Sequence, residues 1–96
     1  MKNLSQFKKT MVLGRELEML TWNGTTPPEK IRGVRQVVGV QTNGIWIAPF
    51  PESKNRSWMD FPKASELEIH TQNHFTIRDT TKDGDVFCVR EYLIRN

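Results

Sequence analysis

The feature that most constrains this chain of 96 residues is an Asn-Gly pair, Asn43-Gly44, between two runs rich in β-branched residues. An Asn-Gly pair in this setting predicts a two-residue type I′ turn, in which both central residues have a positive φ. We therefore expect a β-hairpin with one strand over residues 31–41 and the other over residues 45–48.

Alternation of side-chain types predicts further strands on both sides of the hairpin. Residues 15–22 place Met19 on one face and Trp22 on the opposite face. Within the hairpin, Gly33 or Gly39 is the expected site of a bulge or kink. Later strands are expected over residues 57–61, 67–70, 75–78 and 86–94.

Turn-forming residues separate these strands. The proline-containing stretches 23–30 and 49–56 are expected to be long polar loops, because each proline removes a ladder donor and restricts the preceding residue. Residues 62–66 have the pattern of a single helical turn, and residues 72–73 and 82–85 that of tight turns.

The N-terminal segment has the pattern of a short amphipathic helix over residues 3–12, with Leu4, Phe7 and Met11 on one stripe and Gly14 beyond its end. We expect a single domain over residues 1–96. Its N-terminal helix lies within residues 1–13 and its β domain within residues 15–94. The expected fold class is mainly β, an SH3-like partly open barrel or an antiparallel meander; an α+β sheet with a helix on one face is the alternative.

Composition limits the size of the core and the kind of partner. Only 36% of the residues are hydrophobic, so either the core is thin or another copy of the chain covers part of the apolar surface, and a homo-oligomer is expected. The 14 basic and 11 acidic residues give a net charge of +3, which suits an anionic ligand. Because no run of five like charges occurs, an arm for duplex DNA is disfavoured.

Cys88 is the only cysteine, which excludes an intrachain disulfide and a cysteine-based metal site. The N-terminal residues contain no apolar run of the kind found in a signal peptide, and no stretch approaches the length of a membrane span. We therefore expect a cytoplasmic protein that does not bind a membrane, in the host cytoplasm if a phage encodes it.

Two tryptophans lie at loop borders, where indoles can stack on a planar ligand. Trp22 precedes the Pro-Pro loop and Trp58 follows the Pro-Phe-Pro loop. The structural alternative is that each indole covers an end of the barrel while its N–H donates to a carbonyl. Trp46, between two isoleucines of the hairpin, is expected to be structural.

Basic side chains near the first long loop are candidates for an anion site. Arg32 and Arg35 flank the entry to the long strand, and a guanidinium can bind phosphate oxygens or stack on a base. Arg78, from a later strand, and Asn43, from the hairpin turn, complete the expected ligand contacts. The alternative is that these side chains only keep a strand face solvated.

No spacing in the chain predicts catalysis, a metal or a cofactor. His70 and His74 are expected to be ordinary residues around a turn, because a metal site needs a third ligand. Cys88 is expected to be a buried structural thiol. Asp60 is expected to cap the helical turn that follows it, and pairing with a basic residue is the alternative.

The chain resembles small proteins of phages and prophages over two segments, GVRQVVGVQTNGIWI (33–47) and SWMDFPKASELEI (57–69). Some phage anti-defence proteins of this size bind nucleotide second messengers of bacterial immunity, including cyclic ADP-ribose-like signals and cyclic oligonucleotides, without degrading them. The resemblance implies such a role, and it carries over no individual residue.

We therefore expect a non-enzymatic phage-type protein that sequesters a small anionic nucleotide signal. A nucleic-acid-binding module of the SH3 or OB kind is the first alternative, and its affinity would fall steeply with salt. A protein inhibitor of a host enzyme, such as an anti-CRISPR, is the second alternative, with exposed aromatic residues as anchors.

Overall fold

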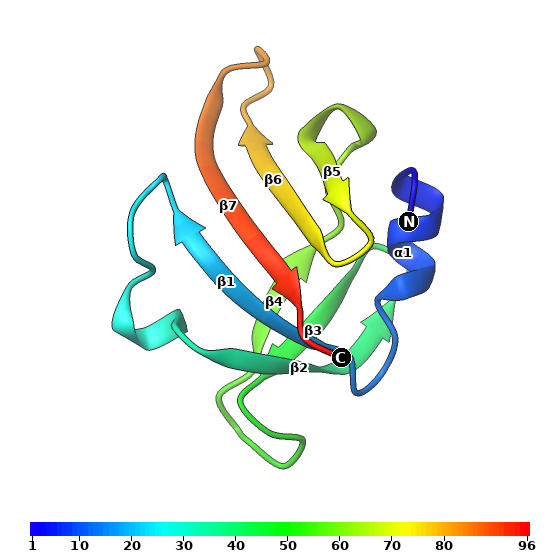
Figure 1. Cartoon of the computed structure of the whole chain (residues 1–96), viewed down its shortest axis with the longest axis vertical. Helices are drawn as coiled ribbons and strands as arrows, with labels where there is room; N and C mark the ends of the chain where they lie inside the picture. The colour runs from blue at the N-terminus through cyan, green and yellow to red at the C-terminus, as the bar shows by residue number, and fades with distance from the viewer.

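The computed structural model describes residues 1–96, which form one antiparallel sheet of seven strands and one short α-helix, so the expected mainly β fold is confirmed (Figure 1). The elements in chain order are α1 (Leu4–Thr10), β1 (Glu16–Trp22), the 3₁₀ helix η1 (Glu29–Ile31), β2 (Val34–Gln41), β3 (Gly44–Ala48), β4 (Ser57–Asp60), the 3₁₀ helix η2 (Ala64–Glu66), β5 (Leu67–Thr71), β6 (His74–Thr80) and β7 (Val86–Ile94). None of its helices has the length and apolar character needed to cross a membrane.

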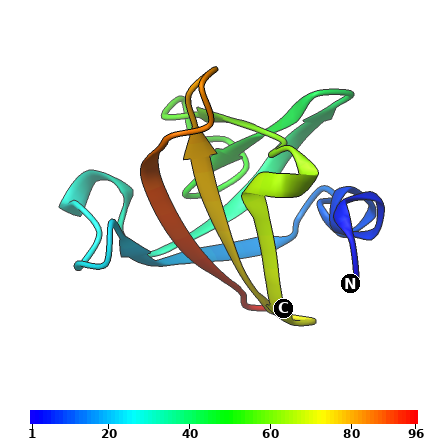
Figure 2. The same cartoon turned by 90° about the horizontal axis from the view of Figure 1, so that it is seen from above.

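The sheet is curled but not closed. Its strand order is β4-β3-β2-β1-β7-β6-β5, so β4 and β5 are the two edges, and η2 lies on the connection between them. Helix α1 lies on one side of the curled sheet, while the β1–β2 connection with η1 lies on the other side (Figure 2). This arrangement agrees with the expected partly open barrel or meander.

Helix α1 is held mainly by the packing of Phe7. A seven-residue helix is marginal by itself, although the Asn3 side chain caps it by accepting a hydrogen bond from the Gln6 N–H. Phe7 is fully buried, and its ring makes edge contacts with Phe75 at 4.9 Å and Phe61 at 6.3 Å between centroids. The helix therefore seals its side of the barrel with an aromatic core.

The β2–β3 hairpin is confirmed, but the expected type I′ turn at Asn43-Gly44 is wrong. Gly44 pairs with Gln41 as the first residue of β3, so the turn residues are Thr42 and Asn43, and neither has a positive φ. Gly44 has a different reason to be glycine. A Cβ at this position would lie 2.5 Å from the Met59 carbonyl oxygen and 2.5 Å from Cζ2 of Trp58.

Positive φ angles occur instead at the other Asn-Gly pair of the chain. Asn23 has a φ of 50° and Gly24 a φ of 78°, and Trp22 and Thr25 exchange backbone hydrogen bonds of 2.9 and 3.0 Å around them. This is the pattern of a type I′ turn. The first part of the expected loop is thus a tight reversal that ends β1 just after Trp22.

Strand β2 begins three residues later than expected. Residues 29–31 form η1, and Gly33 has a φ of 99°, which extended backbone does not allow. The register of β2 against β3 shifts between Val37 and Gly39, so the bulge expected near Gly39 is confirmed. The turn at residues 72–73 and the last strand are also confirmed.

Candidate functional site

A cavity of about 140 Å³ lies against strands β1, β2, β3, β4 and β7. Eight of its twelve lining residues are hydrophobic. The side chains that give the cavity its character are two indoles, one phenol and two guanidinium groups, from Trp22, Trp58, Tyr92, Arg35 and Arg90.

A β-bulge brings Trp22 into the cavity. Strict alternation predicts that Trp22 lies on the face opposite Leu17 and Met19, but all three side chains line the cavity. The register of β1 against β7 shifts between Met19 and Thr21, and the extra residue reverses the alternation after it. The expectation for the facing of Trp22 is therefore wrong, and its side chain lines the same cavity as those of Leu17 and Met19.

Trp58 is held from several sides. Its ring packs edge-on against Trp46, with centroids 5.2 Å apart, and its edge lies over Gly44. Its Nε1–H donates to Oδ1 of Asp60 over 2.6 Å. Asp60 therefore fixes the indole and does not cap the helical turn as expected. The turn begins only at Ala64, and the Glu66 carboxylate accepts the hydrogen bond of the Lys63 N–H instead.

Arg90 is a charged wall of the cavity, with a side chain 16% exposed. It donates to Oδ1 of Asp79 over 3.0 Å and to the Tyr92 hydroxyl over 3.1 Å. Burial lowers the pKa of Arg90, but the interactions with Tyr92 and Asp79 outweigh this effect and raise the net pKa, so the guanidinium is charged. Burial raises the pKa of Tyr92, which keeps its hydroxyl neutral.

Two arginines that line the cavity each have a buried donor without an acceptor. Arg35 donates through Nη2 to the Lys30 carbonyl, and its Nε–H has no partner. The Nε–H of Arg90 also has none, and these are the only buried side-chain nitrogen or oxygen atoms left unpaired in the chain. Because a buried donor without an acceptor costs about 1–3 kcal/mol of stability, two such arginines beside one cavity indicate a role other than stabilising the fold.

Two hollows adjoin the cavity. A groove of about 440 Å³ shares Trp22, Trp58 and Arg90 with it and contains the carboxylates of Asp60 and Asp79. Cys88 also lines this groove; burial raises the pKa of its thiol, so the thiol is neutral.

The second hollow, a cleft of about 520 Å³, shares Ile31, Arg35 and Ser57 with the cavity. Its charged lining residues are all basic: Lys30, Arg35 and Arg56. The groove thus carries mixed charge, with two carboxylates and Arg90, whereas the cleft is entirely basic.

The structure brings together three of the six expected ligand contacts, Trp22, Arg35 and Trp58. Arg32 is turned away and donates to the Pro27 carbonyl over 3.1 and 2.9 Å. Asn43 does not line the cavity, and its carbonyl accepts from the Phe61 N–H over 2.9 Å.

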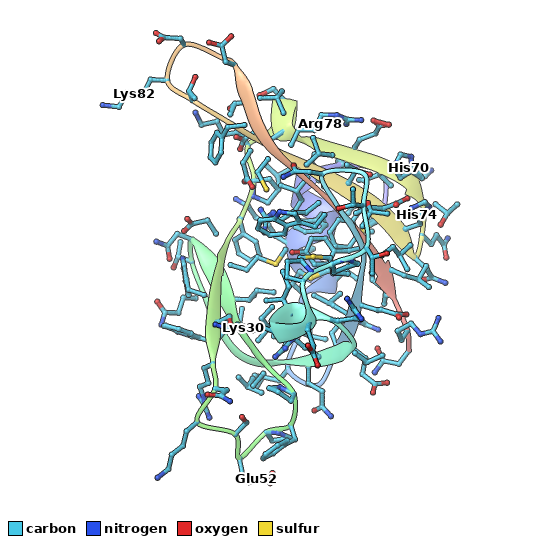
Figure 3. The ribbon with its side chains drawn as sticks, turned by 90° about the vertical axis from the view of Figure 1, so that its left-hand side faces the viewer. Lys30, Glu52, His70, His74, Arg78 and Lys82 are labelled. Atoms are coloured by element: carbon cyan, nitrogen blue, oxygen red, sulfur yellow. The ribbon has the colours of Figure 1, made fainter.

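Arg78 is also outside the site. It pairs with Glu68 over 2.7 Å, near His70 and well apart from Lys30 (Figure 3). Sequence reasoning missed Tyr92, and it considered Arg90 only for a positive rim that depended on the last strands meeting the first, so neither was among the expected ligand contacts. The available signal was the alternation that places both on the same face of β7 as the apolar Cys88.

The two histidines form a separate cluster. Their rings lie 4.5 Å apart between centroids, and His74 Nε2 contacts the Glu91 carboxylate. This hydrogen bond is the main reason that the pKa of Glu91 is lowered. No group of three His, Cys, Asp or Glu side chains in the chain has the arrangement of a metal site.

Searches of protein-family models, of curated proteins and of solved structures find no match to this chain.

Proposed function

We propose that this chain is a non-enzymatic binding protein that captures a small anionic nucleotide. One observation carries the proposal: Arg35 and Arg90, which each have a buried Nε–H without a partner, line one cavity together with Trp22 and Trp58. Flat aromatic walls suit a base, and fixed cationic donors suit its carbonyl or ring-nitrogen acceptors.

The size of the cavity supports a single aromatic ring system. An apolar cavity of about 150 Å³ holds a benzene-sized molecule, and this cavity has nearly that volume before its open side is counted. Stacking of a base on an aromatic side chain contributes about 1–3 kcal/mol to binding. One base seated here would leave its sugar and phosphate outside the cavity.

The ligand would engage both arginines of the site. Acceptors on the base would pair with the guanidinium groups of Arg35 and Arg90, whose buried Nε–H groups have no partners in the free protein. A hydrogen bond to a charged group contributes about 1.5–3 kcal/mol, so the two donors supply affinity as well as orientation. Asp79 and Tyr92 hold the Arg90 guanidinium in place before the ligand arrives, which lowers the entropic cost of binding.

In this proposal the protein acts by sequestration, as a phage-type anti-defence protein in the host cytoplasm that binds a cyclic nucleotide or a cyclic ADP-ribose-like signal. In this proposal each chain carries its own site. Assembly into a homo-oligomer through the exposed edges β4 and β5 is a separate part of the proposal, and the mass of the protein in solution tests it.

Calorimetric titration with cyclic mononucleotides, cyclic dinucleotides and ADP-ribose isomers tests the function. We expect one class to bind, and we expect the intact ligand to be recovered after the protein is denatured by heat. Trp58→Leu removes the stacking surface and should weaken binding at least tenfold, whereas Phe50→Leu, at an exposed position outside the cavity, should not. Absence of binding by every member of the panel refutes the proposal.

The same titration separates capture of a nucleotide from binding of nucleic acid. A small ligand with one or two phosphates loses little affinity when salt rises, whereas a polymer that releases many counterions loses several orders of magnitude. Tight binding of single-stranded oligonucleotides with a steep salt dependence would replace the proposal with the nucleic-acid alternative.

A further inference from the structure

The basic cleft beside the cavity concentrates the free positive charge of this part of the chain. Five ion pairs occur in the structure, and they engage Arg78, Arg90, Arg95 and the two histidines. Lys30, Arg35 and Arg56 take part in none of them. Three cations without carboxylate partners therefore line one hollow, where they repel one another unless an anion is bound.

The backbone fixes two of these cations in place. Arg56 donates from Nε to the Ser53 carbonyl over 3.4 Å and from Nη2 to the Pro51 carbonyl over 3.2 Å, which leaves its Nη1 without a partner. Arg35 is tied through Nη2 to the Lys30 carbonyl, which joins β2 to η1. These contacts use carbonyl oxygens, which orient a guanidinium but do not neutralise its charge.

No acidic side chain lines the cleft, although Glu29 precedes Lys30 in η1. Glu52 lies at the far tip of the β3–β4 connection, whereas Lys30 lies on the η1 turn above it (Figure 3). The carboxylates of Asp60 and Asp79 lie in the groove that adjoins the opposite part of the cavity. The groove has two carboxylates and one cation, Arg90, whereas the cleft has three cations and no carboxylate, so a phosphate attached to a base in the cavity is favoured in the cleft.

We propose that the cleft lined by Lys30, Arg35 and Arg56 is a phosphate subsite that continues the aromatic cavity. The ligand is then a nucleotide with its base in the cavity and its phosphate in the cleft. Arg35 lines both the cavity and the cleft. This inference rests on the proposed function, because the subsite is useful only when a base occupies the cavity. It adds Lys30 and Arg56 as residues that recognise the ligand.

The test compares each of the four common nucleosides with its 5′-monophosphate by calorimetric titration. The wild-type protein should bind at least one monophosphate about tenfold or more tightly than its nucleoside, since each charged contact to phosphate contributes roughly that factor. The Lys30→Gln/Arg56→Gln variant should lose this preference while it binds the nucleoside as the wild type does.

A matched control removes two charges elsewhere. Lys82→Gln/Arg95→Gln makes the same change in net charge at positions outside the cleft, and it should keep the preference for the monophosphate. Lys30→Arg should also keep it, and the thermal unfolding midpoint checks that each variant is folded.

The outcomes distinguish this inference from the proposed function. Equal binding of nucleosides and monophosphates by the wild type, or an unchanged preference in Lys30→Gln/Arg56→Gln, refutes the phosphate subsite and leaves capture of a base in the cavity. Absence of binding by all eight compounds and by the cyclic panel refutes both.

Discussion

The aromatic core is packed completely on one side of this curled sheet and borders a cavity on the other. On the helix side, Phe7 fills the space beside Phe75 and is fully buried. The Phe75 ring stacks on Tyr92, at 5.3 Å between centroids, and Tyr92 also lines the cavity, beside two arginines that each have an unpaired Nε–H. The difference indicates that packing on the helix side supplies stability, while the cavity side retains features that cost stability and suit a ligand.

The largest effect on stability is expected on the helix side. Phe7→Ala removes a fully buried ring and should lower the free energy of unfolding by about 3–5 kcal/mol, measured by urea denaturation. Leu13→Ala, at a side chain 68% exposed, is the matched control and should change the stability little. A loss below about 1 kcal/mol for Phe7→Ala would show that α1 does not seal the core.

A smaller loss of stability is expected at Gly44, which lies against the Trp58 ring that lines the cavity. Gly44→Ala places a methyl group against the Met59 carbonyl and the Trp58 ring, both 2.5 Å away, so the ring must shift. We expect a loss of about 1–3 kcal/mol and a shift in the tryptophan emission maximum. Gly39→Ala meets only Trp46, at 3.2 Å, and should cost less. Equal losses for the two variants would contradict the close approach at Gly44.

The connection between the two sheet edges carries a dependence on pH. Hydrogen bonds to the buried Glu66 carboxylate lower its pKa. The bond from the Lys63 N–H has the largest effect, and those from the hydroxyl and the N–H of Thr80 have smaller effects. Because the folded-state pKa lies below the unfolded value of about 4.3, Glu66 stabilises the fold above that pH, and the contribution is lost as pH falls through the folded-state pKa.

Glu66→Gln should therefore cost about 1–2 kcal/mol at pH 7 and less at pH 3, measured from urea midpoints at both values. Glu68→Gln, at an exposed position of β5, is the control and should cost less at pH 7. A penalty for Glu66→Gln that does not change with pH would contradict the assigned role of the carboxylate.

The smallest effect on stability is expected at the cavity itself. Arg35→Met removes a buried donor without an acceptor and keeps much of the side-chain volume, so we expect the free energy of unfolding to change by less than about 1 kcal/mol or to rise. Nucleotide binding should be lost in the same variant. A large loss of stability would mean that Arg35 supports the fold and would weaken its assignment to the site.

Local sequence signals predicted which helices and strands occur in this protein better than they predicted the exact turns between them. The helix pattern of Leu4 and Phe7 and the alternation of the last strand led to the correct elements, because both depend on side-chain periodicity along one segment. The turn at residues 42–43 was misplaced because the conformation of an Asn-Gly pair is also decided by what packs against it. At Gly44 that neighbour is the Trp58 ring, which comes from another strand.

The candidate site was predicted in part. Trp22, Arg35 and Trp58 were recognised by residue type and by their place beside loops, and the structure places them around one cavity. Arg32 and Arg78 have the same chemistry, but a carbonyl and a carboxylate engage them elsewhere. No sequence pattern distinguishes a guanidinium that has an acceptor from one that lacks it, because the acceptors come from strands whose pairing is not visible in the sequence.

The amino-acid sequence by itself determined a small, mainly β domain with a short N-terminal helix, since side-chain periodicity and turn chemistry act between neighbours in the chain. Only the tertiary structure decided which side chains share a cavity, through the bulge that redirects Trp22 and the pairing of β1 with β7 that brings Arg90 beside it. The physical reason is that one residue of register shift reverses the face of every later side chain, and many long-range contacts together set that shift.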